Sequence, residues 1–257
     1  MQTFNGHPPI NSSGVLPMRL VLASVSALAL VACGGPAAPV NTAETPAETA
    51  PAAVPEAAPA EAPAAEVKYG KTAAYKLDPT HASLIWRVKH FGLSNYTARF
   101  TDFDATLQFN PDDASATSLT ATINPASVET DYPGDYKAGH ADSGFDSWNQ
   151  DLGQSDKYFN AGAFPQITFN TTEVSTTGPD TGTVTGDLTF LGVTKPVTLD
   201  VKYNGVGQFP WAPEQDHIGF SATTTLTRSD FGLTAGTPYV GDEVEIIIEA
   251  EFGEAAE

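Results

Sequence analysis

Apolar and polar residues alternate one by one along many short segments of this chain beyond residue 67. In the last of these segments, glutamates separate most members of an apolar series formed by Val244, Ile246, Ile248, Ala250 and Phe252. Since successive side chains of a β-strand point to opposite faces, this period of two predicts a strand with one apolar and one polar face. Seven further segments alternate in the same way, around residues 84–88, 103–109, 119–123, 167–169, 188–190, 197–201 and 218–226.

About eight strands of this kind, with no long amphipathic helix between them, predict an all-β domain. One apolar face per strand is typical of an antiparallel sheet, and closure into a barrel would leave no exposed edge. The stretch GDLTFLGVTKPVTLDV (186–201) predicts two of these strands, joined by a tight connection at GVTKP. Small residues at inward positions could leave room along a barrel axis; they are Ala105, Ala121, Gly186 and Ala222.

The segment from Thr130 to Phe164 interrupts the regular strand pattern. It carries no clear period and predicts irregular or short helical structure. It is rich in aromatic residues, namely Tyr132, Tyr136, Phe145, Trp148, Tyr158 and Phe159. A connection of this length inside a compact β domain is typical of a lid or a binding loop.

The segment 33–67 consists almost entirely of Ala, Pro, Glu, Thr and Val after its first residues, and it has no aromatic side chain. Such a composition cannot bury a core, so we expect a disordered, extended tether. In a polyproline conformation it would reach up to about 100 Å. The foldable domain is therefore expected at 68–257.

A short apolar run after Arg19 ends at Cys33, the single cysteine of the chain. The run is too short to span a membrane and has the build of a secretory signal. Its end, LVAC, resembles a bacterial lipobox, which predicts that Cys33 is lipidated after cleavage of 1–32. An ordinary signal peptide is the alternative, and Met1 or Met18 could be the start. Gly34 after the cysteine favours the outer membrane, so we expect a periplasmic lipoprotein of the cell envelope.

The formal net charge of −19 excludes a nucleic-acid partner, because phosphate binding needs clustered Lys and Arg. The single cysteine and the spacing of His81 and His90 predict no metal site. No nucleophile elbow, phosphate loop or dinucleotide-binding glycine motif occurs, so no catalytic residue is predicted and no cofactor is required. Arg228 fits a structural ion pair as well as an anion site.

Several motifs of the domain resemble those of YceI-like proteins. They are YKLDPTHASLIWRVKHFGLSNYTARF (75–100), FPQITF (164–169), GDLTFLGVTKPVTLDV, TRSDFGL (227–233) and GDEVEIIIEAEF (241–252). The resemblance implies an eight-stranded antiparallel lipocalin-like β-barrel that holds a long apolar molecule. The ligand types it implies are polyisoprenoids, isoprenoid quinones and fatty amides, bound by a protein that is not an enzyme.

A chain-like ligand needs a continuous apolar wall, and inward positions of the predicted strands can supply it. His90 continues the inward face of one strand and could meet a polar head group at the barrel mouth. The predicted lining set is Trp86, Val88, His90, Phe100, Phe103, Leu107, Phe169, Leu188, Phe190, Phe220 and Phe231. Two alternatives stay open: the same residues fill the core of a structural envelope protein, or an enzyme uses Asp, His or Arg at the mouth on a hydrophobic metabolite.

Overall fold

The computed structural model describes residues 66–255. The predicted signal segment 1–32, the lipidation of Cys33 and nearly all of the predicted tether lie outside the described residues. None of the helices in the described part has both the length and the apolar character needed to cross a membrane.

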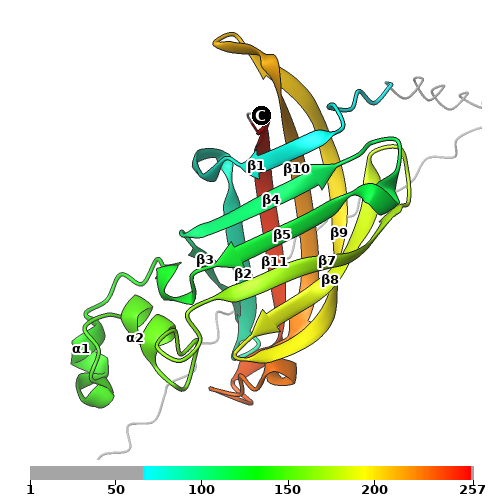
Figure 1. The fold of residues 1–257 in the computed structure, drawn as a ribbon. Helices are drawn as coiled ribbons and strands as arrows, with labels where there is room; N and C mark the ends of the chain where they lie inside the picture. The colour runs from blue at the N-terminus through cyan, green and yellow to red at the C-terminus, as the bar shows by residue number, and fades with distance from the viewer. Residues whose placement is uncertain (1–65, 256–257) are drawn as a thin grey trace, which may run out of the picture. The chain divides into compact units, whose positions relative to one another are not determined.

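The described residues form one antiparallel sheet with two short helices beside it (Figure 1). The strands are β1 (Ala73–Leu77), β2 (Ser83–His90), β3 (Ser94–Phe100), β4 (Phe103–Phe109), β5 (Ser118–Ile123), β6 (Val128–Thr130), β7 (Ile167–Thr176), β8 (Thr181–Phe190), β9 (Val193–Phe209), β10 (Ala212–Thr227) and β11 (Val240–Glu254). The helices are α1 (Tyr136–Gly139) and α2 (Trp148–Gln154), with 3-10 turns at η1 (Pro79–His81), η2 (Ala114–Ala116), η3 (Pro125–Ser127), η4 (Ala141–Ser143) and η5 (Arg228–Phe231).

The sheet closes into a barrel because β1 pairs with both β4 and β11. Six short strands are the halves of three bent ones: β1 continues into β2, β3 into β4, and β5 into β6. The first and second bent strands pair along both halves, through β1 with β4 and β2 with β3. The second and third bent strands do the same, through β4 with β5 and β3 with β6. Counted this way the barrel has eight antiparallel strands, which confirms the predicted fold.

Two of the three bends have a local cause in the sequence. Pro79 and Pro125 open the turns between the strand halves, and a proline has no N–H to continue a ladder. Neighbouring bends are joined by backbone hydrogen bonds: Thr101 donates to the carbonyl of Ser127 over 3.2 Å, and Asn124 donates to that of Asp102 over 2.9 Å. The sheet can therefore change direction in three adjacent strands and curve around an interior.

The connection between β8 and β9 differs from the prediction. The turn is made by Leu191 and Gly192, with φ values of 50° and 74°, and Pro196 already lies in β9 opposite Asp187. A two-residue turn with positive φ at both positions matches the twist of the flanking strands. The predicted connection at GVTKP was wrong because Pro196 reads as a turn residue, although it occupies a strand position.

One end of the barrel interior is filled by aromatic side chains. We call this group the aromatic plug: Tyr75, Phe109, Tyr203, Phe220 and Phe252. Phe109 stacks on Tyr203 at 5.8 Å, and Phe220 meets Tyr203 and Phe252 edge-on at 5.3 and 6.0 Å. Tyr75 is 0% exposed and contacts Phe109 at 6.1 Å. The rings therefore pack against one another at this end of the interior.

Candidate ligand-binding site

A cavity of about 620 Å³ occupies the barrel interior beside the aromatic plug. This volume lies within the range of small-molecule sites, about 300–1,000 Å³. Leu77 and Phe252 border the cavity on the side of the plug. Aliphatic and aromatic side chains make up nearly all of the wall, so the cavity suits an apolar molecule.

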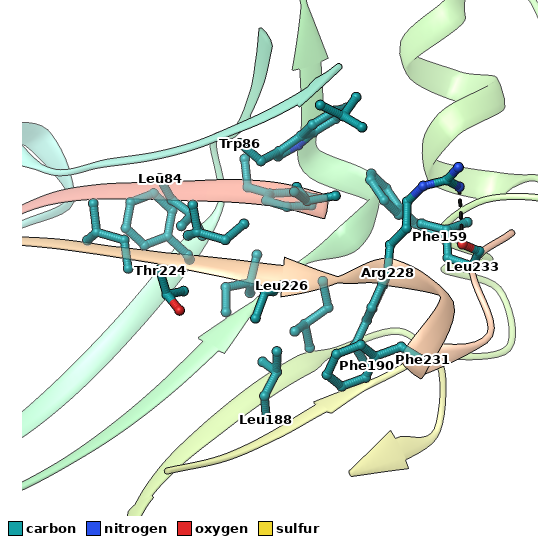
Figure 2. Close-up of a pocket in the computed structure, with 18 of the residues that line it drawn as sticks. Leu84, Trp86, Phe159, Leu188, Phe190, Thr224, Leu226, Arg228, Phe231 and Leu233 are labelled. Atoms are coloured by element: carbon teal, nitrogen blue, oxygen red, sulfur yellow. Dashed lines mark hydrogen bonds between the residues drawn. The ribbon is translucent and has the colours of Figure 1, made fainter. Parts of the chain in front are cut away.

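Opposing strands supply the wall (Figure 2). Leu84 and Trp86 come from β2, Leu188 and Phe190 from β8, and Leu226 lies on β10 between them. These side chains point into one space because each occupies an inward position of the alternation. The cavity is thus built by the same pattern that predicted the strands.

Nine residues of the predicted lining set border this cavity: Trp86, Val88, His90, Phe100, Phe103, Phe169, Leu188, Phe190 and Phe231. The structure places the other two elsewhere. Leu107 lies in the buried cluster around the plug, and Phe220 belongs to the plug itself. Both face inward as predicted, but alternation reports only the face of the sheet and not the level along the barrel.

The small inward residues also divide into two groups. Ala105 and Ala121 line the cavity, so their size leaves space there. Ala222 is buried in a cluster with Phe169, and Gly186 is covered by the same ring. A Cβ at Gly186 would come within 2.4 Å of Phe169 Cζ, so the glycine admits an aromatic ring and leaves no gap in the wall.

The segment 131–166, which we call the lid, covers one part of the cavity. It contains α1 and α2, which lie together at one end of the barrel in Figure 1. Sequence reasoning predicted a lid here but named none of its residues as ligand contacts. The lid contributes Tyr132, His140, Trp148, Leu152, Tyr158 and Phe159 to the lining. The signal that could have found them is the density of aromatic residues in a segment without strand pattern.

Phe159 fastens the lid to three parts of the barrel wall. Its ring lies 6.0 Å from Trp86, 5.4 Å from Phe100 and 5.9 Å from Phe190. A polar contact adds to this packing, because the indole N–H of Trp148 donates to the Tyr96 hydroxyl over 2.8 Å. The lid is therefore packed onto the wall.

Local hydrogen bonds shape the lid itself. Ser147 caps α2 by accepting from the N–H of Gln150 over 3.1 Å, as serine does at helix starts. Asn149 of α2 accepts from both the N–H and the hydroxyl of Thr130, over 2.9 and 2.7 Å. The buried Asp151 accepts a hydrogen bond from the Tyr136 hydroxyl, and burial is the main cause that raises the pKa of Tyr136.

Arg228 is buried at the cavity wall, with 6% of its surface exposed. Its guanidinium donates to the carbonyls of Leu233, Ala235, Val240 and Gly241 and to the hydroxyl of Thr237, over 2.7–3.2 Å. Burial lowers its pKa. No ion pair of Arg228 occurs among the described residues, so the structural ion pair considered from the sequence is wrong. Arg228 instead holds the loop before β11 in place.

Several other polar groups of the wall have no hydrogen-bond partner within residues 66–255. The buried indole N–H of Trp86 is one, and its ring packs against Tyr96 and Phe159. The hydroxyl of Tyr158 is another, on a half-buried side chain, whereas the Tyr132 hydroxyl and the His90 ring belong to exposed side chains. Since unpaired polar groups are uncommon in a wall of this kind, the groups of Trp86 and Tyr158 are candidates for ligand contact.

His81 does not line the cavity, whereas His90 does. The Nδ1 atom of His81 lies 2.8 Å from Asp78 Oδ2, which raises the pKa of His81 and lowers that of Asp78 to about 2. With Glu251 they place one possible ligand atom each within 4.8 Å of one another. The spacing of histidines in the sequence could not reveal this grouping, because Glu251 comes from β11.

A comparison with protein families identifies the domain that forms this barrel. The model of the YceI-like domain matches residues 75–252. The chain belongs to the YceI-like family. The resemblance predicted from the sequence motifs is thereby confirmed.

Individual YceI-like relatives support this membership. A UPF0312 protein of Pseudomonas paraeruginosa is 36% identical over 181 residues, which cover 70% of this chain and 86% of the relative. Protein YceI of Salmonella arizonae is 37% identical, with the same shares of 70% and 86%. The crystal structure of a Campylobacter jejuni YceI protein is 30% identical, covers 65% of this chain and 90% of its own, and superposes with a TM-score of 0.54.

Proposed function

We propose that this protein binds one long apolar molecule in the barrel cavity. The ligand classes are a polyisoprenoid, an isoprenoid quinone or a fatty amide, and the protein acts as a carrier, store or stress-related binder. The single observation that carries the proposal is the continuous apolar cavity of about 620 Å³ beside a solid plug. A barrel that served only as a structural element would need no such space.

The energetics favour a chain-like ligand. Transfer of apolar groups out of water contributes about 0.8 kcal/mol per methylene, so a long hydrocarbon chain gains affinity from length alone. The wall around Trp86, Leu188 and Phe190 can replace water along that chain. Arg228 is the permanently charged side chain of the described lining, and its donors are already used by the protein.

The proposed setting is the periplasmic side of the outer membrane. Lipidated Cys33 would anchor the chain, and the tether would let the barrel move through roughly 100 Å of periplasm. A lipid-binding barrel held near a bilayer could take up or release an apolar molecule without exposing it to water. This placement rests on the lipobox-like LVAC and the composition of 33–67.

Mass spectrometry of organic extracts tests the proposal on the full chain, purified without detergent extraction of its ligand. We expect about one lipid per folded barrel. Ala121→Phe places a ring in the cavity and should lower the lipid content severalfold, whereas Ala116→Phe, at an exposed site on η2, should leave it unchanged. Folded wild-type protein that carries no lipid and takes up none on exposure would contradict the proposal.

A further inference from the structure

We propose that the cavity selects ligands whose polar end is an uncharged oxygen, and that the Tyr158 hydroxyl recognises this oxygen. The inference rests on the proposed function, because it concerns the head of the same bound molecule. Beyond binding to an apolar wall, it predicts that phosphorylated lipids are disfavoured. It also predicts that one residue of the lid determines the preference for an uncharged oxygen.

Tyr158 has a fixed position in the lid. Its ring meets Trp148 edge-on at 5.5 Å, and its backbone N–H donates to the carbonyl of Ser155 over 3.0 Å, so its position is fixed. The hydroxyl lacks a partner in the described part of the chain, as does that of the more exposed Tyr132, whereas two further hydroxyls at the lid are paired. That of Tyr96 accepts from Trp148, and that of Tyr136 donates to Asp151.

The hydroxyl of Tyr158 is a neutral donor under ordinary conditions. Burial, followed by the charge of Asp151, raises its pKa, while Arg228 acts in the opposite direction. A protonated phenol can donate to a carbonyl or hydroxyl oxygen of a ligand and can also accept a hydrogen bond. A half-buried hydroxyl without a protein partner is therefore suited to a neutral oxygen.

Arg228 does not provide a phosphate site. Binding of a phosphate inside a protein relies on charge-assisted hydrogen bonds from free donors, and an anion that is removed from water without them is costly. Each N–H of the guanidinium already points at a backbone carbonyl or at the hydroxyl of Thr237. An anion could gain these donors only if the loop before β11 were released.

The charge of the lid also disfavours an anion. Residues 131–146, which supply Tyr132 and His140 to the cavity, contain four aspartates and one lysine. That lysine, Lys137, is already paired with Asp146. A diphosphate at this end of the cavity would meet net negative charge, whereas an uncharged head would not.

Three probes with the same fifteen-carbon skeleton test the inference: farnesol, farnesyl diphosphate and the headless hydrocarbon farnesane. Each is titrated into the full-length chain after lipid extraction and refolding, below the concentration at which it forms micelles. We expect farnesol to bind at least tenfold more tightly than farnesyl diphosphate. Tyr158→Phe should weaken farnesol binding about five- to tenfold, the effect of one lost hydrogen bond, and leave farnesane within twofold.

Tyr239→Phe is the matched control, because Tyr239 is exposed and does not line the cavity, and it should change none of the three affinities. Equal or tighter binding of farnesyl diphosphate would overturn the inference, as would an equal loss of farnesol and farnesane binding in Tyr158→Phe. Failure of all three probes to bind would instead refute the proposed function, and this inference with it.

Discussion

The two ends of the barrel interior use the same strands and the same alternation, yet one is solid and the other hollow. At the solid end, the ring of Phe109 on β4 stacks on that of Tyr203 on β9 across the barrel, and Phe220 packs against the latter. At the hollow end, Ala105 and Ala121 stand at inward positions, and opposing side chains do not meet. An eight-stranded barrel is just wide enough for either outcome. The difference shows that side-chain size at each level, and not the fold, decides whether such a barrel has a cavity.

The hollow end also differs in how it is closed. The plug closes one end with side chains of the strands themselves. The lid is a separate segment that closes part of the other end. It is held in place by Phe159 and by the hydrogen bond between Trp148 and Tyr96. A ligand site needs an end that can be covered and entered, and the lid lies at that end.

The largest expected loss of stability follows from a substitution in the plug, and a substitution in the cavity wall should have a smaller effect. Tyr75→Ala removes a ring that is 0% exposed and should lower the free energy of unfolding by about 3–5 kcal/mol. Phe190→Ala, in the cavity wall, should lower the free energy of unfolding by less than half as much, because its ring borders space that is already open. The same variant should weaken ligand binding. Urea denaturation and lipid titration measure the two effects. Equal losses of stability would contradict the division into a solid and a hollow end.

A second prediction concerns the loop held at the hollow end. Arg228→Met leaves buried carbonyls without donors and should lower the free energy of unfolding by about 2–3 kcal/mol. Hydrogen exchange should increase most in residues 233–241, because these carry the carbonyls that Arg228 binds. A variant as stable as the wild type, with unchanged exchange in this loop, would show that Arg228 does not hold it.

A third prediction concerns the substitution of phenylalanine for each of two inward alanines. Ala222→Phe places the ring in a packed cluster and should lower the free energy of unfolding by about 1–3 kcal/mol. Ala121→Phe places it at the cavity wall and should lower the free energy of unfolding by less than Ala222→Phe does, since space is available there. Thermal unfolding of the two variants provides the comparison. The reverse order of stability would mean that the cavity is closed in solution.

The smallest effect is expected where β1 bends into β2. The pKa of Asp78 falls to about 2 through its hydrogen bond with His81, so its contribution to stability is present above its ordinary value of 3.8 and is lost toward pH 2. The raised pKa of His81 adds stability below 6.5, and this share is lost as the pH rises through the raised value. The destabilisation caused by Asp78→Asn should therefore be largest between about pH 4 and 6.5. A loss that is the same at pH 2.5 and pH 5 would exclude this pairing.

The sequence predicted the fold well because alternation and motif order are local signals. The eight strands, their antiparallel pairing and seven of the nine predicted residues that border the cavity follow from a period of two, whereas Phe100 and Phe231 stand outside the predicted alternating segments. Leu107 and Phe220 could not be separated from the cavity set, since the period gives the face of a strand and not its level. The short strands β1, β3 and β6 were missed as separate elements because the bends depend on contacts between neighbouring strands.

The lid residues could not be predicted from sequence periodicity, for a different reason. Tyr158 and Phe159 follow α2 in a segment without regular period. Phe159 packs against β2, β3 and β8, and Tyr158 packs against Trp148 of α2. Arg228 lies in η5, and its role depends on how the chain from Leu233 to Gly241 folds around its guanidinium. Only the three-dimensional arrangement shows that its donors are used by a loop rather than by a carboxylate.

A crystal structure of the full-length protein, purified with its bound lipid, tests the central claim most directly. We predict elongated density that runs along Trp86, Phe169 and Leu188, ends at Leu77 and Phe252, and leaves the aromatic plug unchanged. Density only outside the barrel, or a lid collapsed into a dry interior with no ligand, would contradict the account.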